Sequence, residues 1–119
     1  EGGSPDLFVL LGLASTVMGV TTTIGLPVPL VNTGSNPNQI AVSGGVLYIL
    51  NSGDNNVTAM DVSTTKYLGV AVNFDPGVNP YDFAFADLDG ATVMYVTGFL
   101  SNTLYEVDPA TGKILRKVQ

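Results

Sequence analysis

The sequence of 119 residues contains no cysteine and no histidine. The first absence excludes a disulfide scaffold and thiolate metal sites. The second removes the commonest general base, a common zinc ligand and one member of any Ser-His-Asp triad. Charged residues are scarce as well, at 12% of the chain, whereas hydrophobic residues reach 45%, the reverse of the balance that marks disorder. The composition therefore predicts a folded domain and disfavours enzymatic chemistry without deciding that question.

Basic residues are nearly absent from most of the chain. The formal net charge is −6, and Lys66 is the only basic residue before Lys113. A surface of this sign repels phosphate backbones and anionic lipid, so no nucleic-acid partner is expected. Few lysines, no cysteine and many Gly, Thr, Asn and Val residues are typical of an extracellular, cell-surface or periplasmic protein.

The apolar run Leu7–Val20 is similar in composition to the core of a signal peptide. No basic residue precedes it, although a signal peptide needs a basic n-region. It is also shorter than the roughly 20 residues that a spanning helix requires. We therefore predict buried strands here and no membrane span. Because the chain begins at Glu1, we expect a processed form or a piece of a longer polypeptide.

The sequence repeats with a period of about 43 residues. Asn36–Val42 is similar to Asn79–Phe85, and Val46–Leu50 is similar to Val93–Thr97. Asp6–Leu10 is a third, degenerate copy of the second pattern. Each full copy continues with another apolar alternation, a polar turn and a last alternating stretch, so each unit predicts four short strands. No segment has a helical period, and helix content should be near zero.

Four antiparallel strands in a unit of about 40–45 residues indicate a β-propeller blade. The predicted fold class is all-β, with antiparallel four-stranded blades forming a partial propeller of about 2.75 blades. Residues 1–35 are predicted to be a degenerate first blade that has strands 2–4 and lacks the inner strand. Residues 36–78 form the second blade and residues 79–119 the third.

The second and third units resemble YVTN-type β-propeller repeats. Pro37–Asp61 follows the family pattern P-N-x-I-A-V … L-Y-V-x-N-x-x-x-N-x-V-x-V-I-D, and Tyr95–Gly98 departs from Tyr-Val-Thr-Asn only at its last residue. Asp108–Lys113 matches the family turn D-P-A-T-G-K, which quinoprotein-type blades share in part. The resemblance implies a propeller from an extracytoplasmic family that includes surface-layer proteins. It implies no particular activity.

Several residues recur at equivalent positions and are therefore predicted to have structural roles in each repeat. They are Pro37 and Pro80, Tyr48 and Tyr95, and Asp61 and Asp108. Asp61 and Asp108 end the third strand of their units, so each carboxylate is predicted to accept hydrogen bonds from the amides of the turn that follows. The alternative is a pair of functional carboxylates near the centre of a ring.

Two further pairs are candidate binding residues. Asp87 and Asp89 lie in an Asp-x-Asp-Gly sequence that could begin a Ca²⁺ loop, but the Glu expected twelve residues along is absent, and Asp-Gly is a hairpin signal. No other cofactor is expected. Tyr81 and Asp82 begin an inner strand near a channel mouth and are the predicted ligand contacts. The oxygen-rich segment 51–56 is predicted to be a loop between strands.

A stack of fewer than four blades leaves blade faces and strand edges uncovered. We expect further blades of the same chain or other copies of the chain to cover them. The predicted function is an extracytoplasmic structural or interaction segment, a scaffold or self-assembling surface protein without catalytic chemistry. The alternatives are a fragment of a lactonase-like or quinoprotein-like propeller enzyme, and a propeller that binds glycans or small ligands.

Overall fold

The computed structural model describes residues 5–21 and 26–119, and within them the chain forms eleven strands and one turn of 3-10 helix. The first three strands are β1 (Leu7–Leu11), β2 (Thr16–Thr21) and β3 (Leu26–Asn32), with the helical turn η1 (Gly12–Ala14) after β1. The next four are β4 (Pro37–Ser43), β5 (Val46–Asn51), β6 (Asn56–Asp61) and β7 (Tyr67–Asn73). The last four are β8 (Pro80–Leu88), β9 (Ala91–Gly98), β10 (Thr103–Asp108) and β11 (Lys113–Val118).

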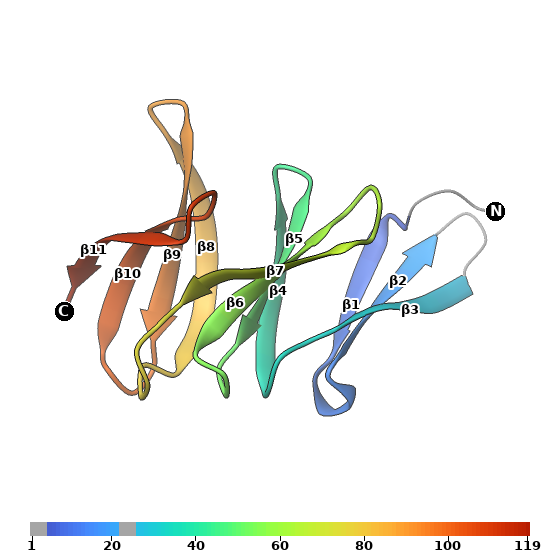
Figure 1. Cartoon of the computed structure of the whole chain (residues 1–119), viewed down its shortest axis with the longest axis horizontal. Coiled ribbons are helices and arrows are strands. Elements are labelled where there is room, and N and C mark those ends of the chain that lie inside the picture. The colour runs from blue at the N-terminus through green and yellow to red at the C-terminus, as the bar shows by residue number, and fades with distance from the viewer. Residues whose placement is uncertain (1–4, 22–25) are drawn as a thin grey trace.

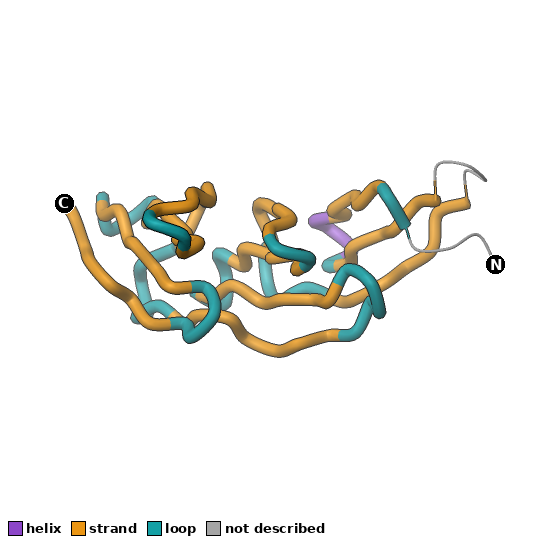
Figure 2. The backbone as a smooth tube through the Cα atoms, turned by 90° about the horizontal axis from the view of Figure 1, so that it is seen from above, coloured by secondary structure: helices purple, strands orange, loops and turns teal. Residues whose placement is uncertain are grey.

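These strands form three separate antiparallel sheets that stand side by side in chain order (Figure 1). The first sheet is β1-β2-β3, the second β4-β5-β6-β7 and the third β8-β9-β10-β11. The row measures 46 × 35 × 19 Å, and seen from above it is open rather than closed into a ring (Figure 2). The predicted fold class is confirmed: the chain is all-β, its sheets are blade-like, and the stack is not closed.

Tight two-residue turns join the first two strands of the second and third sheets. Gly44 and Gly45 have φ values of 58° and 77°, and Asp89 and Gly90 have values of 52° and 82°. Positive φ at both central residues matches the right-handed twist of the flanking strands. Asp89-Gly90 is therefore a hairpin turn between β8 and β9, with Leu88 paired to Ala91.

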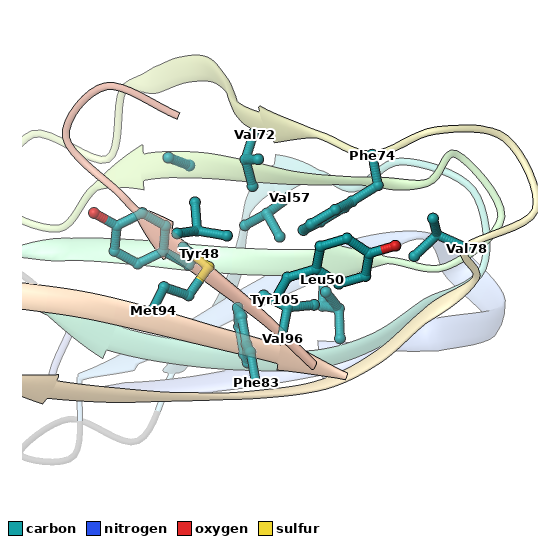
Figure 3. Packing of buried hydrophobic residues seen from close by; sticks show 12 residues of the cluster. Tyr48, Leu50, Val57, Val72, Phe74, Val78, Phe83, Met94, Val96 and Tyr105 are labelled. Carbon is teal, nitrogen blue, oxygen red and sulfur yellow. The ribbon is translucent and has the colours of Figure 1, made fainter. Parts of the chain in front are cut away.

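The main hydrophobic core lies between the second and third sheets (Figure 3). Its aromatic rings meet at short range: the Tyr48 and Phe85 centroids are 5.0 Å apart, and those of Phe74 and Tyr105 are 5.1 Å apart. Its other buried members are Leu50, Val57, Ala59, Val72, Val78, Phe83, Met94, Val96 and Val107. Each large buried side chain contributes roughly 1.5–3 kcal/mol of transfer free energy, so this contact holds the two sheets together.

A second core lies on the opposite face of the second sheet, against the first sheet. Leu47, Ile49 and Met60 are buried there with Val17 of β2, and Phe8 of β1 packs against them. The second sheet is therefore covered on both faces. This explains why β5 is an almost continuous apolar run instead of an alternation of apolar and polar residues.

The apolar segment Leu7–Val20 forms strands, as predicted, but they are not buried throughout. Leu7, Val9 and Leu11 are 47%, 38% and 41% exposed. They alternate with side chains that face the second sheet, and no described sheet covers their own side. Among residues 5–21 and 26–119, no helix is long and apolar enough to cross a membrane.

Candidate functional site

The oxygen-rich segment 51–56 binds the linker that enters the second sheet. Asn51 Oδ1 accepts a hydrogen bond from the Gly34 amide at 2.9 Å, and Asp54 Oδ2 accepts one from the Ser35 amide at 2.8 Å. Asn51 is completely buried. These oxygens satisfy backbone donors that would otherwise lack partners. Their role is to fix the path of the chain from the first sheet to the second.

The Asp61 carboxylate organises the turn between β6 and β7. Its Oδ1 accepts hydrogen bonds from the Ser63 amide at 2.8 Å, the Ser63 hydroxyl at 2.7 Å and the Thr64 amide at 3.0 Å. The Ser63 hydroxyl, followed by the Thr64 amide, holds the pKa of Asp61 below its ordinary value, because both stabilise the ionised form. This is the acceptor geometry that the recurrence of the residue predicted.

Asp108 also accepts hydrogen bonds from the turn that follows it, but with both carboxylate oxygens. Its Oδ1 accepts from the Ala110 amide and its Oδ2 from the Thr111 hydroxyl, both at 3.0 Å. The turn closes with a hydrogen bond of 2.8 Å from the Gly112 amide to the Asp108 carbonyl. Gly112 sits directly against the backbone of Ala71 on β7. The Asp-Pro-Ala-Thr-Gly turn is therefore a contact between neighbouring sheets.

A groove of about 410 Å³ runs beside that turn, between the second and third sheets. Tyr48, Val70, Pro109 and Thr111 are among the residues that line it. Burial, followed by the charge of Asp108, raises the pKa of Tyr48. This hydroxyl therefore stays protonated at neutral pH. Polar and apolar atoms line the groove in similar amounts, and it lies along the contact between the two sheets.

Asp87 and Asp89, the candidate Ca²⁺ residues, lie at the exposed tip of the β8–β9 hairpin. Asp87 Oδ1 accepts a hydrogen bond from the Thr92 hydroxyl at 2.9 Å, and Asp89 is the first residue of the turn. Across the described part of the chain, no group of three or more acidic, His or Cys side chains is placed to hold a metal ion. The structure thus brings no third ligand to this pair.

Tyr81 and Asp82, the candidate ligand contacts, lie at the start of β8. Tyr81 is 55% exposed, and its ring centroid lies 5.3 Å from that of Phe99, which is 64% exposed. Leu100 beside it is also exposed. The sequence reasoning did not include Phe99 and Leu100, although one signal was present: the second repeat has the polar pair Ser52-Gly53 at this position.

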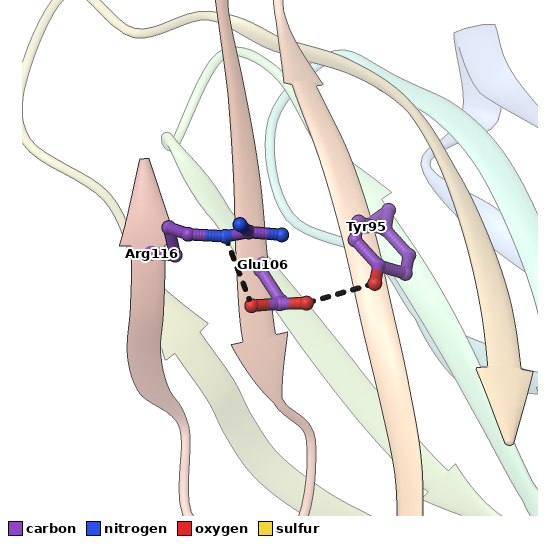
Figure 4. A network of polar contacts seen from close by, with 3 residues as sticks. All are labelled: Tyr95, Glu106 and Arg116. Atoms are coloured by element: carbon purple, nitrogen blue, oxygen red, sulfur yellow. Dashed lines mark hydrogen bonds and ion pairs between the residues drawn. The ribbon is translucent and has the colours of Figure 1, made fainter. Parts of the chain in front are cut away.

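Tyr95 belongs to a polar network on the outer face of the third sheet (Figure 4). Its hydroxyl donates to Glu106 Oε2 at 2.8 Å, and Arg116 Nε lies 3.4 Å from Glu106 Oε1. The hydrogen bond to Glu106 is the main reason that the pKa of Tyr95 is raised. The equivalent Tyr48 instead packs on Phe85. The two tyrosines share a strand position but have different environments.

No protein-family model matches the chain, and no curated protein matches it. The candidate carboxylates Asp61 and Asp108 both accept hydrogen bonds in turns. The remaining distinctive features are surfaces: the uncovered faces at the two ends of the row and the exposed aromatic pair.

Proposed function

We propose that the chain is a structural and interaction segment of a β-propeller, a scaffold that associates through its uncovered sheet faces and strand edges. On this proposal the partners are further blades of the same type or other copies of the chain. The resemblance of residues 36–119 to YVTN-type repeats supports it. So does the blade-like form of the three sheets.

One observation carries the proposal. The corresponding side is buried in the second and third sheets, whereas it is exposed on the first sheet. Leu47 and Ile49 of β5 are buried against the first sheet, and Met94 and Val96 of β9 are buried against the second. On the first sheet this side carries the exposed Leu7, Val9 and Leu11. Adjacent exposed apolar residues of this kind mark interaction surfaces.

Size-exclusion chromatography with light scattering tests the proposal on the 119-residue chain. We expect a mass that is a multiple of 12.3 kDa, because an uncovered blade face is poorly stable in water. Dilution should reduce the mass, since association follows mass action. A folded monomer at all concentrations would contradict the proposal.

An extracytoplasmic location is part of the same proposal. It is supported by the absence of cysteine and the shortage of lysine. Fractionation of the source cells with an antibody against the chain should recover it at the surface, in the periplasm or in the medium. Recovery in the cytoplasmic fraction alone would contradict this part and would leave the association proposal standing.

Glycan or small-ligand binding is a second candidate function, which the Tyr81–Phe99 pair favours. The two exposed rings, which are tilted by 35° to each other, offer an apolar platform with a hydroxyl beside it. A glycan array probed with the chain should show binding that Phe99→Ala and Tyr81→Ala both reduce. Tyr67→Ala, which alters another exposed tyrosine on β7, is the matched control. Equal binding by all variants would exclude this platform.

A further inference from the structure

Each of the three sheets has a residue in the left-handed conformation directly before its penultimate strand. These residues are Ser15 before β2, Asn55 before β6 and Asn102 before β10, with φ values of 51°, 56° and 54°. Few residues other than Gly and Asn adopt this conformation readily. Its recurrence at one place therefore indicates a shared role for the three positions.

In the first two sheets, this residue binds the linker that leaves the sheet. The Ser15 carbonyl accepts a hydrogen bond from the Thr33 amide, and the Asn55 carbonyl accepts one from the Phe74 amide, both at 2.8 Å. Asn55 also uses its side chain, since its Oδ1 accepts a hydrogen bond from the Asn79 amide at 2.8 Å. Asn55 thus holds both ends of the linker between the second and third sheets.

The same linker contributes apolar side chains to the main core. Phe74 and Val78 are both buried, in one cluster with Val57 of β6 and Val72 of β7 (Figure 3). Val57 and Val72 are 0% and 2% exposed, and they are paired with each other across their strands. The linker is therefore held by two hydrogen bonds and by burial of its apolar residues.

The third sheet has the same acceptor, with an open groove beside it. No residue that the structure describes donates a hydrogen bond to the carbonyl or the side-chain oxygen of Asn102. The groove beside Asn102 measures about 340 Å³ and is lined by Leu104 and Val118 among others. Leu104 pairs with Val118 as Val57 pairs with Val72, yet Leu104 and Val118 are 37% and 46% exposed. We call this site the linker slot, and its residues are Thr97, Asn102, Leu104 and Val118.

From this comparison we infer that the linker slot binds the segment that continues from β11 in a longer polypeptide, as the linker to a further sheet. Its first residue donates its amide to the Asn102 carbonyl and places an apolar side chain in the groove, and a later amide binds Asn102 Oδ1. The inference rests on the proposed function and specifies how a further blade is attached. Neither Glu106 nor Arg116 lines the groove, so a linker bound there leaves their ion pair at the surface.

The strand register gives the position of the segment. In the second sheet, the donor to Asn55 is the residue after the one that pairs with the first residue of β6. In the third sheet Leu104 pairs with Val118, so Gln119 lies opposite the first residue of β10. The place of the donor to Asn102 therefore falls directly after Gln119.

A chain extended by a copy of the second linker tests the inference. The extension Phe-Asp-Pro-Gly-Val-Asn-Pro, which repeats residues 74–80, is added directly after Gln119. Urea denaturation should show an equilibrium constant for folding that is about tenfold higher, because the extension adds hydrogen bonds and buries apolar area. The control extension Ser-Asp-Pro-Gly-Ser-Asn-Pro, which lacks both apolar side chains, should give a smaller gain. Equal values with and without the apolar extension would overturn the inference.

Glycine variants of Asn55 and Asn102 are a matched pair, because the two residues have nearly the same φ and Gly adopts that conformation without strain. In the 119-residue chain, Asn55→Gly should lower the folding constant about tenfold, since the Asn79 amide loses its acceptor. Asn102→Gly should change it by less than about twofold. In the extended chain, Asn102→Gly should cause a loss similar to that of Asn55→Gly. A loss that the extension does not increase would overturn the role of Asn102.

Fluorescence reports binding of the extension independently of stability. The chain has no tryptophan, so a single Trp in place of the appended Phe should emit at shorter wavelength when it lies in the groove. Leu104→Ser should reduce this shift, and Leu68→Ser, at an exposed position of β7, is the control. Light scattering of the same samples separates the proposals. A monomer with shifted emission contradicts the proposed association alone, and an associated chain with unshifted emission contradicts the linker slot alone.

Discussion

Gln39 and Asp82 stand at equivalent places on neighbouring inner strands, 43 residues apart, and Gln39 Nε2 donates a hydrogen bond to Asp82 Oδ1 at 3.2 Å. Residues at equivalent positions of the two repeats are thus in direct contact. Asp82 Oδ1 accepts a second hydrogen bond, from the Phe83 amide at 2.8 Å. The same carboxylate therefore orders the start of β8 and ties it to β4.

A double-mutant cycle on this pair measures the tie between the sheets. Gln39→Ala and Asp82→Ala should each lower the free energy of unfolding, and the interaction energy should be about 0.5–1.5 kcal/mol, the net value of an exposed charge-assisted hydrogen bond. Urea denaturation of the two single variants and the double variant supplies the values. Additive losses would show that the contact contributes nothing.

Gly112 provides a second test of how the sheets contact each other. Its φ is 76° and a Cβ there would collide with the Ala71 carbonyl oxygen, whereas Gly45 has a φ of 77° with nothing within 4 Å. Gly45→Ala should cost about 1–2 kcal/mol, the strain of the left-handed conformation alone. Gly112→Ala should cost about 1–3 kcal/mol more, because the turn must also move away from β7. Equal losses in urea would contradict the contact between this turn and the second sheet.

Substitution of the buried Asn51 should lower the free energy of unfolding more than substitution of most other polar residues. Besides accepting from Gly34, its Nδ2 donates to Asn56 Oδ1 at 3.0 Å and to Thr58 Oγ1 at 3.1 Å. Asn51→Ala removes the partner of the buried Thr58 hydroxyl and of two partly buried groups, so thermal or urea unfolding should show a loss of about 2–4 kcal/mol. Asn38→Ala, at an exposed position of β4, is the control and should change stability by less than about 0.5 kcal/mol.

The contribution of Asn51 also shows where sequence reasoning stops. Alignment of the two repeats places Gly98 at the position of Asn51. It does not predict which group takes over the hydrogen bonds of the Asn51 side chain in the third sheet. In the structure, a loop of the second sheet binds the linker into the third sheet: the Asn79 amide donates to Asn55 Oδ1 at 2.8 Å. Contacts between segments of different repeats depend on how the sheets are spaced, which a repeat pattern does not encode.

Strands and turns could be predicted because their signals are local. Gly44-Gly45 and Asp89-Gly90 are dipeptides that accept the positive φ of a tight turn. The alternation of apolar and polar residues beside them is typical of strands. Exposure of Leu7 and Val9 could not be predicted, because both sides of β1 are apolar and burial depends on which sides have neighbours. The Tyr81–Phe99 platform could be predicted only in part, because Tyr81 lies in β8 whereas Phe99 lies in the connection between β9 and β10.

Tyr95 predicts how stability depends on alkaline pH. Its hydroxyl donates to Glu106, so ionisation would place two anions side by side, and the folded-state pKa is raised above the unfolded value of about 10. The folded state therefore holds this proton more tightly. The resulting stability is complete below pH 10 and is lost as the pH rises through the folded-state pKa. Tyr95→Phe should flatten the decline of urea midpoints above about pH 10. Tyr67→Phe, which removes an exposed hydroxyl on β7 outside this network, should leave the decline unchanged. If both variants follow the wild-type curve, the Tyr95–Glu106 hydrogen bond does not persist in solution.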